Sequence, residues 1–494
     1  MKRAAKEIFN TTDKSKLYFF CTLLIAFILK YLIYGFNCFY VLDDYIQYGG
    51  YPMYNDVSYV LFNIGTIVTR PLASILDVVF WGKLWDAPHL MFVISCTFHF
   101  LSCVVFYKTA EENKIYLSPL FAVFYLFFPL GSEGSMWISA SSRIIVGLFF
   151  TSFALYFLTK YEKFGKVKFF LFFLLFSICS FTIYEACAVF CFATSVFILI
   201  NNRQNKRVVF PLISLFVMLF CLLLYMKLCE NIGHMGSRST QSSFLLIFTQ
   251  FKDFLNQLFE IMTSGIFRLT TCGFSKGLGV LFGKGICGIL YLFVIFAVCV
   301  LFGYLFSISK ERLPQKSNTK YLVLIGMVIF SSAFAPNMIT EPVWITYRTM
   351  FIAMIGIYLI CDVLFSKIAN KSLKTIILMV LLFIFTISSI NEYDTYKRTH
   401  ELDITLLNEI CETLPDDVLC GEKETAILLD EVPRALQVSY YKDHVKTVFH
   451  HDWSLTGAVR AYTRNIRIKK VTPVYPDTDF DYSDCYVIDL RTKK

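Results

Sequence analysis

Long apolar runs recur throughout the sequence and constrain its fold more than any other feature. A helix needs roughly 20 apolar residues to cross a bilayer, and about eleven runs approach that length. Only 17% of the residues are charged, against about 25% in a soluble domain. The sequence therefore predicts an α-helical polytopic membrane protein. The predicted spans are 17–39, 88–107, 115–130, 143–160, 168–184, 186–201, 208–228, 286–307, 320–336, 348–366 and 374–391.

Basic residues between the apolar runs predict the orientation of the chain. Lys and Arg gather in alternate loops, and Arg143 and Arg348 are the exceptions at the ends of other loops. Cytoplasmic loops carry the excess of Lys and Arg, so we expect a cytoplasmic N-terminus and a first span retained in the cell membrane as a signal anchor. The net charge of +9 lies in short loops, which does not favour a nucleic-acid partner. The basic loops are 2–16, 108–114, 160–168, 203–207, 310–320 and 367–374.

Two long segments, 40–87 and 229–285, fall on the predicted outer side. The first contains a semi-apolar stretch, 57–85, which Arg70-Pro71 interrupts. A spanning helix there would invert every later loop, so we expect a helix in the membrane interface instead. In the second segment, apolar residues of 244–262 recur every 3.6 residues opposite a polar face. This pattern is typical of an amphipathic helix lying on the membrane.

The composition changes after residue 391. Residues 1–391 are predicted to form the transmembrane domain, and the more polar residues 392–494 a small α/β domain on the outer face. Within the second domain we expect a helix at 424–440, which Pro433 breaks or restarts. The expected strands are 417–420, 445–449 and 485–489.

Two adjacent carboxylates, Asp43 and Asp44, follow the first apolar run. Adjacent like charges repel, which raises one pKa unless a cation lies nearby, and a raised pKa suits a general base. We expect one Asp to remove a proton from an attacking hydroxyl. The other would orient the acceptor or help to hold a divalent cation, such as magnesium or manganese. The sequence leaves open which Asp has which role.

Most other outer loops combine a carboxylate or an Arg with an aromatic side chain. Ionisable groups at membrane depth are costly and tend to mark function. An Arg presents a planar fork that suits phosphate, whereas aromatic faces and carboxylates suit a sugar ring. The sequence therefore predicts a cleft at the outer membrane surface. Its predicted substrate-binding residues are Tyr45, Arg70, Glu133, Trp137, Arg143, Glu185, Glu341, Tyr347 and Arg348.

The motif His450-His451-Asp452-Trp453 is a weaker candidate for a metal site. Adjacent His side chains rarely ligate one ion together, and the sequence offers no evident third ligand. The motif is therefore not assigned to a metal.

The sequence resembles the GT-C superfamily of membrane glycosyltransferases in its acidic pair after the first span, long first outer loop, many spans and small C-terminal domain. Within that superfamily, three segments are similar to the bacterial type II glucosyltransferase family, which decorates surface polysaccharide. These segments are Asp43-Asp44, Thr69-Arg70-Pro71-Leu72 and Trp137 to Arg143. The Asp pair matches best, and the C-terminal domain contributes no motif.

The resemblance implies a hexosyltransferase that takes its sugar from a polyprenyl-phosphate donor. Transfer would occur on the outer face, usually with inversion, to a glycan or lipid-linked acceptor. Asp43 or Asp44 would be the base, and Arg70, Arg143 or Arg348 would face the leaving phosphate.

Two alternatives stay open at this point. A polysaccharide polymerase or ligase would carry its key residues in large later loops such as 229–285. A lipid-linked glycan flippase or transporter would need ionisable residues at mid-membrane and broken helices.

Overall fold

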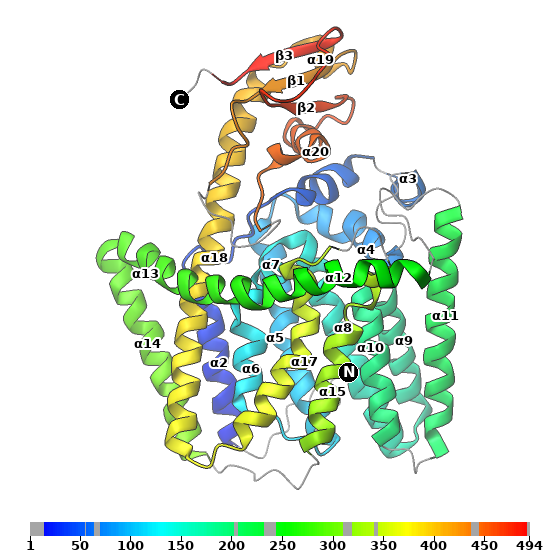
Figure 1. The fold of residues 1–494 in the computed structure, drawn as a ribbon, viewed down its shortest axis with the longest axis vertical. Coiled ribbons are helices and arrows are strands. Elements are labelled where there is room, and N and C mark those ends of the chain that lie inside the picture. Colours follow the sequence, from blue (N-terminus) through cyan, green and yellow to red (C-terminus); the bar gives the residue numbers. More distant parts are fainter. Residues whose placement is uncertain are drawn as a thin grey trace.

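Helices packed side by side form the body of the protein, and a small domain containing the C-terminus stands at one end of it (Figure 1). The structure, a computed structural model, describes residues 14–54, 56–63, 70–201, 206–231, 244–309, 319–339, 344–435 and 444–491. In these residues, six helices are long and apolar enough to cross a membrane: α5 (Pro88–Glu112), α8 (Ile138–Phe164), α11 (Val209–Asn231), α14 (Gly285–Ile308), α17 (Tyr347–Ser366) and α18 (Lys371–Thr413). Four shorter apolar helices accompany them: α2 (Lys14–Leu32), α9 (Val167–Ile183), α10 (Glu185–Asn201) and α15 (Thr319–Ser332).

Ten of the predicted spans each coincide with one of these helices. The remaining span, 115–130, contains the short helix α6 (Pro119–Phe127), which ends before Pro129, and the 3-10 turn η5 (Pro129–Gly131). The number of spans therefore stays a prediction, because four helices are short of the usual length and α6 is shorter still. Further short elements are α7 (Ser132–Met136), η6 (Lys206–Val208) and α16 (Ala335–Ile339).

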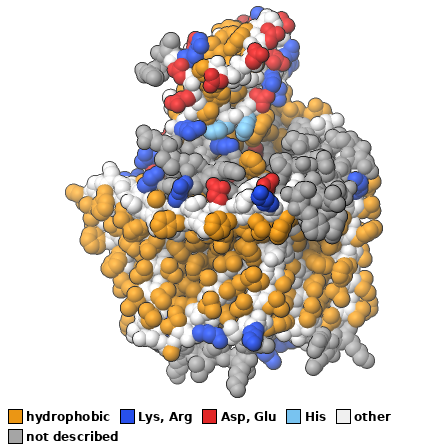
Figure 2. Space-filling model, viewed as in Figure 1, with side chains coloured by type: hydrophobic (Ala, Val, Ile, Leu, Met, Phe, Trp, Pro, Cys, Tyr) orange, Lys and Arg blue, Asp and Glu red, His pale blue; other side chains and the backbone are white. Residues whose placement is uncertain are grey.

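The apolar surface of the bundle identifies it as a membrane protein. In its most apolar window, α8 is 83% buried, whereas α11 and α14 are 11% and 22% buried at the edges of the bundle. Phe220 on α11 and Ile286 on α14 are 65% and 77% exposed. On the face shown in Figure 2, hydrophobic side chains form a wide band across the body, and Asp and Glu gather mainly above it. An exposed apolar surface on helices of this length and hydropathy is expected to face lipid.

The first long segment after α2 consists of short helices. They are η1 (Tyr45–Gly50), η2 (Tyr51–Tyr54), α3 (Val57–Asn63), α4 (Pro71–Leu76), η3 (Asp77–Trp81) and η4 (Gly82–Leu84). Pro71 occupies the first turn of α4, where its missing N–H costs nothing. Both α3 and α4 lie at the end of the bundle that carries the C-terminal domain (Figure 1). None of these helices is long enough to span. The described part of 57–85 contains short helices instead of the single interfacial helix predicted there, and its position in the interface stays a prediction.

The helix predicted at 244–262 is α12 (Phe244–Glu260), which lies across the bundle (Figure 1). Its residues Phe251, Leu255 and Phe259 form an exposed apolar row, as expected for a helix on the membrane surface. The π-helical turns η7 (Ile261–Gly265) and η8 (Arg268–Cys272) continue it into α13 (Gly273–Gly283). The amphipathic-helix prediction is confirmed.

The small domain is built on a parallel three-stranded sheet of order β2-β1-β3. Its strands are β1 (Glu424–Leu428), β2 (Val471–Val474) and β3 (Cys485–Asp489). In the register, Thr425 lies opposite Val471 on one side and Tyr486 on the other. The helix α20 (Asp452–Thr463) connects β1 to β2, because parallel strands need a long crossover connection. The domain also contains α19 (Asp416–Leu419) and η9 (Val448–His450).

Several predictions for this domain were wrong. The strand at 485–489 is confirmed, but 417–420 is helical in α19 and 445–449 contains the 3-10 turn η9. The helix at 424–440 is wrong at its start, because β1 occupies Glu424–Leu428, and residues 436–443 lie outside the described residues. Three consecutive residues of β1 are buried, so its sequence lacks the alternation of apolar and polar residues that would have indicated a strand. The predicted domain boundary at 391–392 falls inside α18, which runs unbroken from the bundle into the domain (Figure 1).

Candidate active site

The two residues of the acidic pair lie in different environments. Leu42, directly before them, has φ +42°, a strained conformation for a residue other than glycine. This turn buries Asp44 completely, and its carboxylate accepts N–H groups from Val41 (3.0 Å) and Ser139 (2.8 Å). Burial raises the pKa of Asp44 well above 3.8, although both backbone N–H groups lower it. Asp44 therefore ties the turn after α2 to the first turn of α8.

Asp43 is the more accessible carboxylate of the pair, since its side chain is only partly buried. It lies close enough to Asp44 to act on it electrostatically. Each oxygen of Asp44 accepts one backbone N–H group, so Asp43 has the more accessible oxygens of the pair. In the part of the chain that the structure describes, no three His, Cys, Asp or Glu residues form a metal-binding group. The divalent cation stays a prediction, and no step below depends on it.

Three predicted residues meet where α7 and α17 face each other. The Nη1 atom of Arg348 donates to Oε1 of Glu133 at 3.3 Å, and its guanidinium lies 4.5 Å above the Trp137 ring. Thr346 caps α17, and this cap places Arg348 in the first turn of the helix. The Glu133 side chain is 2% exposed and that of Arg348 is 22% exposed. The pair is therefore buried on the Glu133 side and open on the Arg348 side.

A second carboxylate reaches the same place from α18. Nε2 of His444 lies 2.7 Å from Oε2 of Glu392, and both side chains are 1% exposed. The ring of Tyr347 packs edge-on against His444 at 5.4 Å. Burial lowers the pKa of His444, but the adjacent Glu392 raises it more, so the net pKa is above 6.5. Glu133 also acts on His444 and raises its pKa.

Tyr396 of α18 links these groups to the acidic pair. Asp44, Glu133, Glu392 and Arg348 all act electrostatically on its buried phenol. The structure therefore gathers four charged side chains from the first loop, α7, α17 and α18 around one tyrosine. We call Glu133, Trp137, Tyr347, Arg348, Glu392, Tyr396 and His444 the interfacial cluster.

Arg143 belongs to a different group of buried residues. It pairs with Asp77 of η3, and its guanidinium donates to the Tyr48 hydroxyl (3.0 Å) and the Ser142 hydroxyl (2.6 Å). The side chains of Arg143 and Asp77 are 5% and 1% exposed. Asp44 acts electrostatically on Tyr48 as well as on Tyr396. Asp44 is therefore close to both this group and the interfacial cluster.

Arg70 and Glu185 form a bidentate ion pair beside Arg143. Nε and Nη2 of Arg70 contact the two Glu185 oxygens at 2.7 and 2.5 Å, and the guanidinium lies 4.7 Å above the Tyr184 ring. About a quarter of each charged side chain is exposed. Arg143 lies close enough to act on Arg70 electrostatically.

Of the two remaining predicted residues, Tyr45 lies beside the acidic pair, because Asp44 acts on it electrostatically. Tyr45 is buried, with its hydroxyl 3.3 Å from Nδ1 of His400 and its ring edge-on to Trp85. Glu341 lies outside the described residues. For all these residues, a part in substrate binding stays a prediction.

Sequence reasoning missed Glu392, Tyr396 and His444. The polar run Asn391-Glu392-Tyr393-Asp394 at the end of the last predicted span was a signal for the first. No local signal pointed to His444, because its partner is 52 residues away.

The His-His-Asp-Trp motif lies at the start of α20. Nδ1 of His450 is 3.4 Å from the Thr447 hydroxyl, and the ring of His451 stacks on Trp453. Asp452 pairs with Lys470 at 2.8 Å.

Comparison with known proteins identifies the family. No curated protein matches the chain. The family model of the glucosyl transferase GtrII matches residues 32–355, which include the acidic pair, Arg70, the start of α8 and Arg348. This confirms the resemblance to the type II glucosyltransferases and indicates a membrane glycosyltransferase that modifies surface glycans. With the match extending over more than half of its length, the chain belongs to the glucosyl transferase GtrII family.

Proposed function

We propose that this glycosyltransferase moves a hexose from a polyprenyl-phosphate donor to a glycan or lipid-linked acceptor. Transfer takes place on the outer face of the cell membrane. The observation that carries the proposal is the interfacial cluster, in which a partly exposed Arg348 lies beside an aromatic ring and acts electrostatically on the same tyrosine as Asp44 of the acidic pair. A lipid-linked donor would reach this cluster sideways from the bilayer with its phosphate at the membrane surface.

In this proposal Asp43 is the general base. It removes the proton from the acceptor hydroxyl while that oxygen attacks the anomeric carbon of the donor sugar. The bond from the anomeric carbon to the phosphate oxygen breaks, and the phosphate leaves with the electron pair. Attack from the face opposite the phosphate inverts the anomeric centre, as the family resemblance implies. Asp43 is chosen over Asp44 because Asp44 is fully buried and engaged by two backbone N–H groups.

Arg348 offsets the charge that develops on the leaving phosphate. Glu133 holds the guanidinium from the buried side, and Trp137 supports its face. About a fifth of the Arg348 side chain is exposed, and an Arg can bind a phosphate through two parallel hydrogen bonds. Glu133 and Asp44 are positioning residues in this scheme, since each fixes a neighbour rather than meeting the substrate.

The donor can be tested in proteoliposomes that contain the purified protein. Radiolabelled glucose is offered either as polyprenyl-phosphate glucose or as a nucleotide sugar, together with the polysaccharide of the source cells. We expect label in the polysaccharide only with the lipid-linked donor. Equal transfer from the nucleotide sugar would contradict the proposed donor.

The orientation of the site can be tested in whole cells. The proposal puts the C-terminal domain and the acidic pair outside, on the side opposite the basic loops that the sequence predicts to be cytoplasmic. An alkaline phosphatase fusion at the C-terminus should be active, and a green fluorescent protein fusion should not fluoresce. The reverse result would put the site in the cytoplasm and exclude transfer on the outer face.

A further inference from the structure

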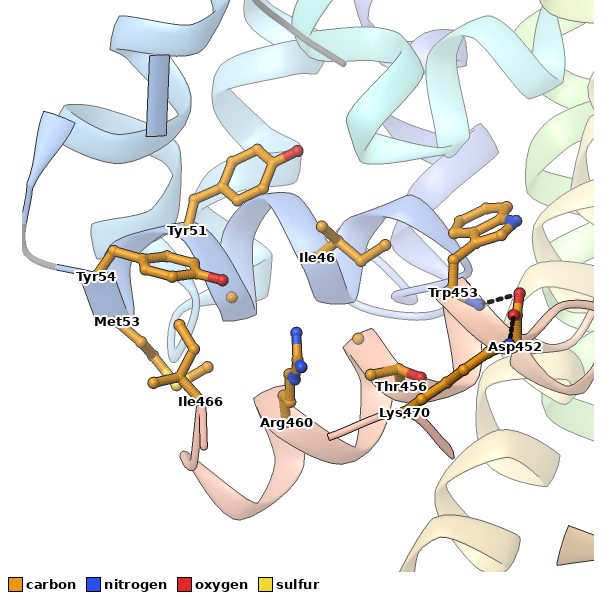
Figure 3. A pocket seen from close by; sticks show the side chains of 12 residues that line it. Ile46, Tyr51, Met53, Tyr54, Asp452, Trp453, Thr456, Arg460, Ile466 and Lys470 are labelled. Atoms are coloured by element: carbon orange, nitrogen blue, oxygen red, sulfur yellow. Dashed lines mark hydrogen bonds and ion pairs between the residues drawn. The ribbon is translucent and has the colours of Figure 1, made fainter. Parts of the chain in front are cut away.

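A cavity of about 390 Å³ lies between the first outer segment and the C-terminal domain. Its upper and lower walls in Figure 3 are the segment containing η1 and η2 and the helix α20. It is lined by Ile46, Gly50, Tyr51, Met53, Tyr54, Asp452, Trp453, Thr456, Gly457, Arg460, Ile466 and Lys470. Neither the acidic pair nor the interfacial cluster contributes to it.

Tight packing holds the two walls of this cavity together. A Cβ atom added to Gly457 would lie 2.3 Å from the Ile46 side chain, and one added to Gly49 would lie 2.5 Å from Cβ of Ala461. Two glycines therefore allow α20 to lie directly on η1. Because the walls are in contact beside it, the cavity is a fixed feature of the fold.

The lining combines flat rings with polar groups. Tyr54 comes from η2, and Trp453, which is 45% exposed, comes from the start of α20. Tyr51, also in η2, is only 2% exposed and acts electrostatically on Arg143, so it backs the wall of the cavity and does not offer its ring to a ligand. Aromatic faces of this kind stack on the apolar faces of sugar rings, and the adjacent hydroxyl and carboxylate groups can hydrogen-bond to sugar hydroxyls. The volume is at the lower end of the range for small-molecule sites, about 300–1,000 Å³, and suits a short piece of glycan.

The positive charge of Arg460 favours an anionic ligand in this cavity. Its Nε donates to the Ile468 carbonyl at 2.7 Å, which fixes the guanidinium, and the side chain extends from α20 toward the segment with Ile46 and Tyr51 (Figure 3). Lys470, the other basic residue of the lining, is already paired with Asp452. Among the described residues, no carboxylate pairs with Arg460. Its fork is therefore available to an anionic group.

We propose that this cavity binds an acidic saccharide unit of the acceptor glycan. The carboxylate of a uronic acid, or a phosphate substituent, pairs with Arg460, and the sugar ring stacks on the aromatic side chains. The proposal rests on the proposed function, because only a transferase needs an acceptor. It explains why the cavity adjoins η1: Ile46 is two residues from Asp44, so a glycan held here delivers a neighbouring hydroxyl toward Asp43.

The binding test uses the full chain in lipid nanodiscs and isothermal titration calorimetry. The probes are a tetramer of galacturonic acid and its methyl ester, which differ in charge but hardly in shape, and glucose 6-phosphate for the phosphate alternative. We expect the acid tetramer or the phosphate to bind at least tenfold more tightly than the ester. Equal affinity for the acid and its ester, with no binding of the phosphate, would overturn the proposal.

Two variants connect the affinity to the cavity. Arg460→Gln should weaken binding of the charged probe at least tenfold, and Arg460→Lys, which keeps the charge but loses the fork, should weaken it less. Arg467→Gln is the matched control, because Arg467 is exposed and does not line the cavity. Unchanged binding in a folded Arg460→Gln protein, or an equal loss in Arg467→Gln, would overturn the proposal.

The same proteins separate this inference from the proposed function. Asp43→Asn should abolish transfer yet bind the charged probe as the wild type does. If the wild-type protein shows Arg460-dependent binding but transfers no sugar, the proposed function is refuted and the binding site is retained. Normal transfer without any binding of a charged probe would refute the site and leave the function in place.

Discussion

Replacing Arg143 with Gln should strongly lower the free energy of unfolding of the protein and should not specifically lower its affinity for the donor. Arg143 was predicted as a substrate-binding residue, but its guanidinium pairs with Asp77 and donates to Tyr48, Ser139 and Ser142. Removing it would leave the Asp77 carboxylate, which is 1% exposed, without its cation. An uncompensated buried charge is costly because the protein interior cannot solvate it as water does.

The expected loss follows from this burial. Breaking a buried pair by removing one partner costs about 3–5 kcal/mol, a large part of the 5–15 kcal/mol or so that stabilises a typical folded protein. The comparison variant is Arg70→Gln, because the Arg70–Glu185 pair is about a quarter exposed. Water screens such a pair, so we expect a loss nearer to 1 kcal/mol.

The assay is the free energy of unfolding in mixed detergent micelles, followed by tryptophan fluorescence during titration with sodium dodecyl sulfate. The double variant Asp77→Asn/Arg143→Gln should recover part of the loss, since it removes the stranded charge. The structural reading would be refuted if Arg143→Gln unfolded like the wild type and only its KM for the donor increased. In that case Arg143 would be a substrate ligand.

Three further predictions follow from other contacts. Gly277→Ala should lower the free energy of unfolding by about 1–3 kcal/mol, because the added Cβ would lie 2.2 Å from a carbonyl oxygen of α18. The control is Gly279→Ala, which should not destabilise the protein because a Cβ at Gly279 would meet no atom within 4 Å. Equal losses in the two variants would contradict this explanation. Arg348→Gln should lower kcat/KM for the lipid-linked donor roughly 10- to 100-fold, as expected for the loss of a hydrogen bond from a charged group. An unchanged kcat/KM would show that Arg348 does not contact the phosphate. The His444 pKa is raised by Glu392, so stabilisation by this pair is complete below pH 6.5 and is lost as the pH rises through the raised pKa. The melting temperature of His444→Gln should therefore fall furthest below the wild type at pH 6 and approach it at pH 9; a constant difference would exclude the ion pair.

The membrane helices could be predicted because their signal is local. Backbone groups in a bilayer must be satisfied within the helix itself, so one apolar run is enough to indicate one helix. The same holds for α12, because the spacing of the apolar residues in its own sequence is enough to predict an amphipathic helix. The C-terminal domain was harder, because the buried strand β1 shows no alternation and its parallel partners lie 40 residues or more away in the sequence.

The candidate site could be predicted only in part. The sequence indicated Asp43 and Asp44 as a pair, and Arg348, Glu133 and Trp137 one by one. Which Asp is buried depends on the N–H of Ser139, 95 residues away. Likewise, the sequence could not distinguish a partly open Arg348 from a buried Arg143, because the difference arises from their tertiary partners.

The most direct test of the account is transfer by Asp43→Asn and Asp44→Asn in the proteoliposome assay with polyprenyl-phosphate glucose. The control is Asp86→Asn, since the Asp86 side chain is 86% exposed in the same outer segment. We expect Asp43→Asn to fold normally and to lose transfer by at least 100-fold, in line with the usual contribution of a general base of about 10²–10⁴-fold. Asp44→Asn should lose stability as well as activity, because an amide cannot accept both backbone N–H groups. Wild-type transfer by a folded Asp43→Asn protein would contradict the assignment of Asp43 as the base.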